Sequence, residues 1–190
     1  NFFGNTVDEY VEMATELSKL ERVDALEMNI SCPNVKEGGH QFSSKPELVE
    51  EVVGAVREVT QKFLIVKLSP NVTDITETAK AAETAGANCL SLTNTFVGMV
   101  MDVKTRQPYL ANVTGGVSGP AIKPISLQMV YHTARAVGIP VIGVGGISGL
   151  QTAVDKFEAG ATLIQLYTGM IYGGAYLPSN IIKGLSKYLT

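Results

Sequence analysis

Residues 63–69, Phe63-Leu-Ile-Val-Lys-Leu-Ser69, form an apolar run that is typical of a buried β-strand but carries one lysine. Four similar runs lie at residues 25–31, 87–95, 140–146 and 162–169. A segment with helical periodicity follows each of the five runs. Apolar strands that alternate with helices are typical of a parallel sheet covered by helices.

The expected helices are placed by their capping residues and by the glycines that end them. Thr6-Val-Asp-Glu9 and Ser44-Lys-Pro-Glu47 both fit a capping box, in which a side chain satisfies the first free backbone N–H groups. The segments expected to be helical are 6–20, 44–62, 72–86, 121–137, 148–160 and 178–189. Residues 96–120 are expected to be a long loop.

Five strands in 190 residues suit either an open, doubly wound sheet or part of a closed barrel. Polar residues gather at the carboxyl ends of the expected strands, which is where (β/α)8 TIM barrels build their sites from several strands. The last two strand-to-helix loops are also rich in glycine, where such barrels often bind phosphate. We therefore expect residues 1–190 to be the C-terminal portion of one (β/α)8 barrel domain, holding its last five βα units, with about three upstream strands absent.

The charge balance excludes several classes of protein. The chain has 15 Lys and Arg against 18 Asp and Glu, a formal net charge of −3, so no basic excess suggests binding to nucleic acid or to a membrane surface. No apolar run reaches the roughly 18 residues that span a bilayer, and two cysteines cannot form a disulfide framework. We expect a cytoplasmic protein without a metal site, because no metal-binding spacing of His, Cys or carboxylate residues occurs.

Lys67 is the most informative single residue. Side chains alternate along a strand, so Lys67 shares a face with Phe63 and Ile65. Lysine is almost never buried without a partner, and in a covered strand it should meet an anion or a polar ligand. The alternatives are an edge strand or an end position from which the amine reaches solvent.

Other candidates lie where strands end. Asn29, Asn34 and Asn94 are neutral donor–acceptor groups that suit an amide or imide ligand, although turn chemistry also explains each of them. Cys32, in a loop with two glycines, is a nucleophile, a base or an inert residue. Cys89 lies in an apolar strand, where the inert interpretation is favoured.

Two glycine-containing loops favour an anion site. Gly145-Gly146 and Thr168-Gly169 follow the last two strands and would present backbone N–H groups that suit a phosphate monoester. Simple turn geometry is the alternative. No role is assigned to His40 or His132.

Several motifs in this order resemble those of a known family. They are Met28-Asn-Ile-Ser-Cys-Pro-Asn-Val35 with Gly38-Gly39, Val66-Lys-Leu-Ser-Pro-Asn-Val72, Leu92-Thr-Asn-Thr95, Thr114-Gly-Gly-Val-Ser-Gly-Pro-Ala121 and Ile142-Gly-Val-Gly-Gly146. The chain resembles the class 1 dihydroorotate dehydrogenases over essentially its whole length, most closely the catalytic subunit of subclass 1B, which works with an NAD-linked partner. The resemblance implies an FMN-containing barrel that oxidises dihydroorotate to orotate in pyrimidine (UMP) biosynthesis.

The resemblance also implies roles for individual residues. Cys32 matches the catalytic base that takes the C5 proton of the substrate while a hydride leaves C6, and Lys67 matches the lysine near N1 and O2 of the flavin. The residues that match substrate contacts are Asn29, Asn34, Asn94 and Thr95. The residues that match flavin and phosphate contacts are Lys67, Ser118, Gly119, Gly145, Gly146, Tyr167, Thr168 and Gly169.

The implied partners are dihydroorotate or orotate and an electron-transfer subunit carrying FAD and an iron–sulfur cluster, in a homodimer or heterotetramer. Two cysteines are too few to supply the four thiolates of such a cluster. One departure concerns Gln165-Leu-Tyr-Thr-Gly169, which looks more like the membrane-associated class. Alternatives are a dihydropyrimidine dehydrogenase-like flavin barrel, a flavin-free phosphate-sugar isomerase or lyase barrel, and a noncatalytic fragment.

Overall fold

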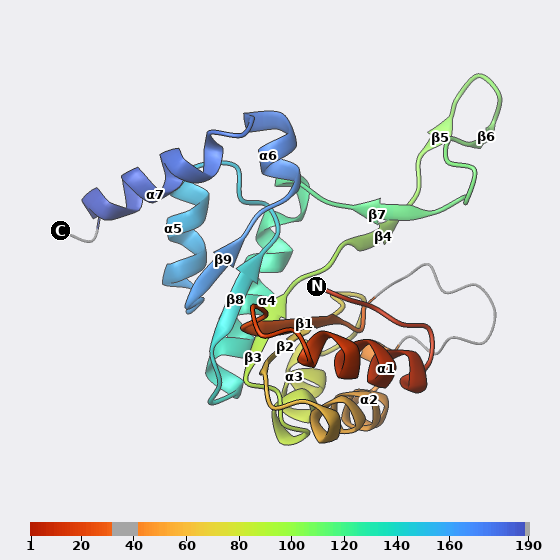
Figure 1. Cartoon of the computed structure of the whole chain (residues 1–190). Coiled ribbons are helices and arrows are strands. Elements are labelled where there is room, and N and C mark those ends of the chain that lie inside the picture. The colour runs from red at the N-terminus through yellow and green to blue at the C-terminus, as the bar shows by residue number, and fades with distance from the viewer. Residues whose placement is uncertain (32–41, 189–190) are drawn as a thin grey trace.

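A five-stranded parallel sheet forms the centre of the molecule (Figure 1). The computed structural model describes residues 1–31 and 42–188. The strands are β1 (Ala25–Asn29), β2 (Phe63–Lys67), β3 (Cys89–Leu92), β8 (Val141–Val144) and β9 (Leu163–Gln165). They lie in the order β1-β2-β3-β8-β9, and every neighbouring pair is parallel. Each of the five expected strands is confirmed.

One helix precedes the first strand, and the others connect successive strands or follow the last of them. The helices are α1 (Val7–Ser18), α2 (Pro46–Val59), α3 (Ile75–Thr84), α4 (Lys123–Ala136), α5 (Leu150–Glu158), α6 (Thr168–Gly173) and α7 (Leu177–Tyr188), with short 3-10 turns at Phe42–Ser44 and Pro120–Ile122. The order of strands in space equals their order along the chain, without the reversal of a doubly wound sheet. This order is that of a barrel wall.

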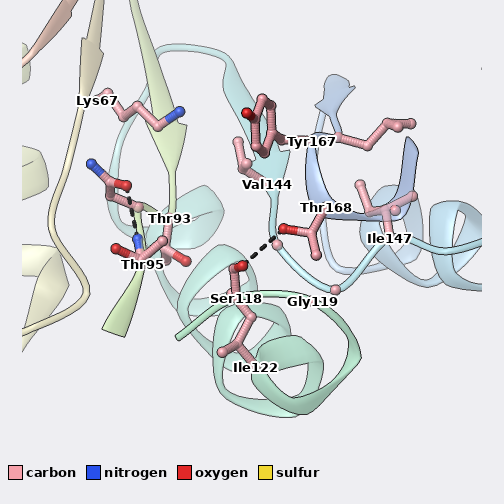
Figure 2. A pocket seen from close by; sticks show the side chains of 15 residues that line it. Lys67, Thr93, Thr95, Ser118, Gly119, Ile122, Val144, Ile147, Tyr167 and Thr168 are labelled. Carbon is pink, nitrogen blue, oxygen red and sulfur yellow. Dashed lines mark hydrogen bonds between the residues drawn. The ribbon is translucent and has the colours of Figure 1, made fainter. Parts of the chain in front are cut away.

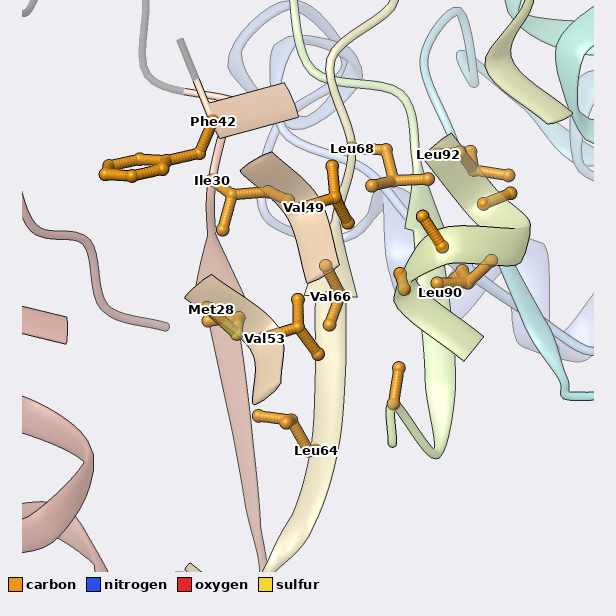
Figure 3. Close-up of a cluster of buried hydrophobic side chains, with 14 of the residues drawn as sticks. Met28, Ile30, Phe42, Val49, Val53, Leu64, Val66, Leu68, Leu90 and Leu92 are labelled. Atoms are coloured by element: carbon orange, nitrogen blue, oxygen red, sulfur yellow. The ribbon is translucent and has the colours of Figure 1, made fainter. Parts of the chain in front are cut away.

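The two faces of the sheet have different surroundings. In β1 and β2, buried residues alternate with less buried ones. Met28, Val66 and Leu90 point to the helix side, where they pack with valines of α2 such as Val49 and Val53 (Figure 3). The opposite face carries Glu27, Asn29 and Lys67, which are only half-buried. A sheet with helices on one face and polar side chains on the other has the inner and outer surfaces of a barrel.

Glu27 ties together the two ends of this sheet. Its Oε1 accepts hydrogen bonds from Ser91 Oγ of β3 at 2.7 Å and from Gln165 Nε2 of β9 at 3.2 Å. Its Oε2 accepts one from Asn1 Nδ2 at 3.0 Å. Because β1 and β9 are the outermost strands of the order, these contacts require the sheet to curl around its inner face.

The segment 96–120 differs from the expected loop. It contains two antiparallel strand pairs, β4 (Phe96–Gly98) with β7 (Gly115–Val117) and β5 (Met101–Asp102) with β6 (Gln107–Pro108). They form an arm that projects from the body (Figure 1). Asp102 begins the turn at the tip, because its Oδ1 accepts from the backbone N–H groups of Lys104 and Thr105. Strands of two or three residues are too short to produce a readable alternation in the sequence.

Of the two expected capping boxes, only the N-cap half of the first is present, because the Glu9 side chain accepts from the Asn5 N–H and not from the Thr6 N–H. Thr6 caps α1, with its Oγ1 accepting from the Glu9 N–H at 3.2 Å. The prediction for Ser44 is wrong, because the N-cap of α2 is Lys45, which makes no side-chain capping bond. Ser44 instead ends the preceding 3-10 turn, and Pro46 supplies the fixed first turn of α2.

Two further features were not expected from the sequence. The short helix α6 begins at Thr168, where the last strand was expected to continue. Phe2 forms a parallel bridge with Met28 on the outer edge of β1, with the Phe2 N–H donating to Glu27 O at 2.9 Å. Across residues 1–31 and 42–188, no helix is long and apolar enough to cross a membrane.

The Glu27 contacts predict a pH dependence of stability. Burial raises the pKa of Glu27, but hydrogen bonds from Ser91, Asn1 and Gln165 and the charge of Lys67 outweigh it and lower that pKa below 4.5. A carboxylate with a lowered pKa in the folded state adds stability above pH 4.5, which is lost as the pH falls below it. We expect Glu27→Gln to be less stable than the wild type at pH 6 and to lose less further stability between pH 5 and pH 3, as measured by urea unfolding.

The matched control is Glu50→Gln, which removes the same charge from an exposed position on α2. It should keep the acid sensitivity of the wild type. Equal acid sensitivity of Glu27→Gln and the wild type would contradict the assignment of this network.

Candidate functional site

A cavity of about 290 Å³ opens at the carboxyl ends of the strands (Figure 2). Its walls come from the ends of β2, β3, β8 and β9, from the foot of the arm and from the start of α6. The lining residues are Lys67, Thr93, Asn94, Thr95, Ser118, Gly119, Ile122, Val144, Gly145, Gly146, Ile147, Leu166, Tyr167, Thr168 and Gly169. Ten residues that the sequence proposed as ligand contacts therefore line one cavity.

Lys67 supplies the positive charge of the cavity. It is the last residue of β2, the second strand of the sheet, so the edge-strand alternative is wrong. The side chain is half-buried and its ammonium points into the cavity (Figure 2). Within residues 1–31 and 42–188, no side chain makes a salt bridge or hydrogen bond with this ammonium. Its three donors are thus available to a ligand.

Thr93 lies beside Lys67 and was not singled out from the sequence. The residue is 3% exposed, and its Oγ1 has no hydrogen-bond partner among the described residues. A buried hydroxyl without a partner costs stability, so an orphan atom at a cavity wall points to a ligand that satisfies it. Thr93 is part of the Leu92-Thr-Asn-Thr95 motif, but the sequence does not show that its hydroxyl is buried without a partner.

Three of the predicted substrate contacts belong to one hydrogen-bonded cluster. Asn94 Nδ2 donates to Asn29 Oδ1 at 3.1 Å and to Ser31 Oγ at 2.6 Å, and Asn94 Oδ1 accepts from the Thr95 N–H at 2.8 Å. Asn29 reaches the cavity wall only through Asn94. Cys32 and Asn34, the other residues proposed for this end, lie outside the described residues.

Asn71 holds Thr95 in place and was also missed by the sequence analysis. Its Nδ2 donates to Thr95 O at 3.1 Å, and its Oδ1 accepts from the Val97 N–H at 3.0 Å. The loop after β2 is thereby tied to the foot of the arm. The Ser-Pro-Asn sequence at 69–71 indicates a turn, but it does not reveal that Asn71 bonds to Thr95, which lies 24 residues away.

The opposite end of the cavity consists of hydroxyls and glycines. Thr168 Oγ1 donates to Ser118 Oγ at 2.8 Å, which joins the start of α6 to the arm (Figure 2). Gly119, Gly145 and Gly146 have φ of 81°, 100° and 75°, a region that favours glycine. The Thr168-Gly169 loop expected here is instead the first turn of α6, which still leaves N–H groups unpaired within the helix.

Gly146 is fixed by close contact as well as by conformation. A Cβ at this position would lie 2.6 Å from Lys123 Cα, a backbone atom that cannot move aside. Glycine at 146 therefore lets the turn after β8 pack directly on the start of α4. Gly146 thus contacts the start of α4 and also lines the cavity.

The remaining cysteine and histidine in the described chain do not contribute to this cavity. Cys89 is 3% exposed in β3, and burial raises the pKa of its thiol to about 11. His132 is exposed on α4 next to Tyr131. His40 lies outside the described residues. No group of three or more His, Cys, Asp or Glu side chains in residues 1–31 and 42–188 could hold a metal ion.

The cavity can hold an extended ligand with two different ends. Lys67, Thr93 and the amide cluster suit a planar polar ring that carries oxygen or nitrogen acceptors. Gly145, Gly146 and the Ser118–Thr168 pair suit an anion such as a phosphate group.

We expect the turn at Gly146 to be intolerant of a side chain. Gly146→Ala places a Cβ against Lys123 at positive φ, so the free energy of unfolding should fall by about 1–3 kcal/mol. The matched control is Gly54→Ala in α2, where a Cβ meets nothing within 4 Å. It should raise the free energy of unfolding by about 0.5–1 kcal/mol, because alanine favours the helix. Chemical denaturation measures both, and equal effects would contradict the strained turn.

Comparison with known proteins identifies the family. A model of the dihydroorotate dehydrogenase family matches residues 1–189. A Trichlorobacter lovleyi protein named "dihydroorotate dehydrogenase B (NAD(+)), catalytic subunit" is 53% identical over 189 residues, covering 100% of this chain and 62% of that protein. A Geobacter metallireducens protein of the same name is 57% identical over 168 residues, covering 88% and 55%. The chain thus spans about three-fifths of these relatives.

A solved structure gives the same fold. The crystal structure of the Eimeria tenella enzyme DHODH, in complex with ferulenol, superposes with a TM-score of 0.79 at 24% identity. The match covers 98% of this chain and 55% of that one. This likeness and the curled parallel sheet confirm that the chain forms part of a (β/α)8 barrel. By the family model and its relatives, the chain belongs to the dihydroorotate dehydrogenase family.

Proposed function

We propose that this chain is part of an FMN-dependent oxidoreductase that converts dihydroorotate to orotate in pyrimidine biosynthesis. The observation that carries the proposal is one cavity that is lined at one end by Lys67 and by Thr93, whose buried hydroxyl has no partner among the described residues, and at the other end by a glycine turn. The relatives that share about half of its residues bear the corresponding enzyme name.

The donor set of the cavity fits FMN. The buried Thr93 Oγ1 and the Lys67 ammonium would hold the polar edge of the flavin ring. Ser118, Thr168 and the turn at Gly145 would hold its phosphate. When bound, FMN supplies the acceptor for a hydride from the substrate.

The chain's own residues would orient the substrate, remove its proton and stabilise the charge on the cofactor. Asn29, Asn34, Asn94 and Thr95 would orient the substrate ring through its amide groups, and the Asn94 cluster already fixes two of these amides. The Cys32 thiolate would take the C5 proton as general base. The Lys67 cation would stabilise negative charge that develops on the cofactor ring.

The electrons then have to leave the barrel. Because the relatives are named as catalytic subunits of an NAD(+) enzyme, we place an electron-transfer subunit with FAD and an iron–sulfur cluster beside this chain, in a cytoplasmic homodimer or heterotetramer. The Gln165–Gly169 sequence, which looks more like the membrane-associated class, does not outweigh those relatives at about half identity.

The test uses the full-length, FMN-loaded protein under anaerobic conditions. Adding dihydroorotate should bleach the oxidised flavin absorbance, and dihydrouracil should not. Bleaching by dihydrouracil alone would support a dihydropyrimidine dehydrogenase-like enzyme. A protein that retains no flavin would favour the flavin-free isomerase or lyase.

Cys32→Ala should slow flavin reduction by dihydroorotate by about 10²- to 10⁴-fold, the usual contribution of a general base, and Cys32→Ser should recover part of the rate. A thiol ordinarily has a pKa near 8.5, so the wild-type rate should rise as the pH increases toward that value. Stopped-flow absorbance measures these rates.

The matched control is Cys89→Ala, which removes the buried thiol of β3 and should leave the rate of flavin reduction within about twofold of the wild type. Unchanged reduction in Cys32→Ala would remove Cys32 from the mechanism.

A further inference from the structure

Lys156 is a buried lysine that the proposed reaction does not use. It lies on α5 and is 0% exposed. Its Nζ donates to Ser126 Oγ of α4 at 2.5 Å, and no carboxylate among the described residues pairs with it. A buried charge without a partner is rare and costly, so the environment of this ammonium requires an explanation.

Its position is directly behind the glycine turn of the cavity. Ser126 Oγ, which accepts from Lys156, donates in turn to Val144 O. A Cβ on Gly143 would lie 3.1 Å from Lys156 Cδ, and a Cβ on Gly145 would lie 3.0 Å from Ser126 Oγ. Lys156 and Ser126 therefore fill the outer side of the backbone whose inner side, at Val144 and Gly145, lines the cavity.

The charges around Lys156 do not neutralise it. Lys123 of α4 lies close enough to act on it, and Asp155 of α5 is engaged in an ion pair with Lys123. On the same helices, Glu158 accepts from Tyr188 and Arg135 bonds to backbone carbonyls. The strands β8 and β9 carry no titratable side chain. Burial, and then the charge of Lys123, lower the pKa of Lys156 to about 8.

We propose that Lys156 is a positioning residue for the phosphate group of FMN, holding the Val144–Gly145 backbone through Ser126 and supplying from behind it the positive charge that the phosphate meets. The proposal rests on the function proposed above. A bound phosphate provides the counter-charge that the protein itself does not provide. Phosphate binding and protonation of Lys156 should then favour each other.

This linkage separates Lys156 from a residue with a purely structural role. A phosphate monoester is dianionic above pH 7, so its own ionisation does not change between pH 7 and pH 9.5. Loss of the Lys156 proton in this range should weaken FMN binding. Riboflavin has the same ring without the phosphate, so any ionisation of the ring affects both ligands alike.

The experiment measures the dissociation constants of FMN and riboflavin for the flavin-free, full-length protein at pH 7 and pH 9.5 by fluorescence quenching. The preference of the wild type for FMN over riboflavin should fall by about tenfold at the higher pH, the change that corresponds to a one-unit shift in the pKa of Lys156 on binding. A preference that stays constant with pH overturns the proposal, without the need for any variant.

Lys156→Met keeps the apolar stem and removes the charge. Its preference for FMN at pH 7 should drop about tenfold and become independent of pH, while its free energy of unfolding without ligand should not decrease, because a buried charge is lost. The matched control, Lys80→Met on the exposed face of α3, should behave as the wild type. Wild-type behaviour of Lys156→Met overturns the proposal.

Ser126→Ala provides a second variant in case Lys156→Met does not fold. Removing the hydroxyl breaks the link to Val144 O, so its preference for FMN should also fall at pH 7, and an unchanged preference contradicts the link. If the wild type binds neither flavin, the proposed function itself fails. If it binds FMN but without pH dependence, only the role of Lys156 fails.

Discussion

The structure depends on one geometric constraint, the alternation of side chains along parallel strands. In β1, Leu26 and Met28 enter the helix layer, so Glu27 and Asn29 must face the inside of the barrel. Neighbouring strands continue this pattern, because Asn29 pairs with Lys67 and Lys67 pairs with Ser91. A slip of one residue would bury the charged set among the helices and expose the apolar set. The hydrophobic core and the polar cavity are thus two results of one register.

Local patterns allowed the strands, most helices and the cavity-facing position of Lys67 to be predicted from the sequence. Apolar runs, capping residues and glycines are read within a few positions of one another. The paired strands of the arm were missed because each is only two or three residues long. Glu27, Thr93 and Lys156 were missed for a different reason. Their roles arise from partners brought close by the fold, or from the lack of such partners, and spacing along the chain does not reveal either.

The walls of the cavity are supported by side chains that do not line it. Three glycines in the Gly143–Gly146 segment leave room for side chains of α4 and α5, which pack against the backbone of β8 and its turn. Asn71 similarly fixes the foot of the arm at Thr95. The glycine turn and Thr95 are therefore supported by residues that do not line the cavity, as expected where a site must keep its geometry before a ligand arrives.

The Glu27–Gln165 hydrogen bond joins residues 138 positions apart. Closing such a long segment restricts most of the chain, and contacts of this kind form slowly compared with those inside a single βα unit. We therefore expect the curl of the sheet, and with it the final shape of the cavity, to form late as the chain folds. During synthesis, Glu27 of β1 leaves the ribosome long before Gln165 of β9 has been made.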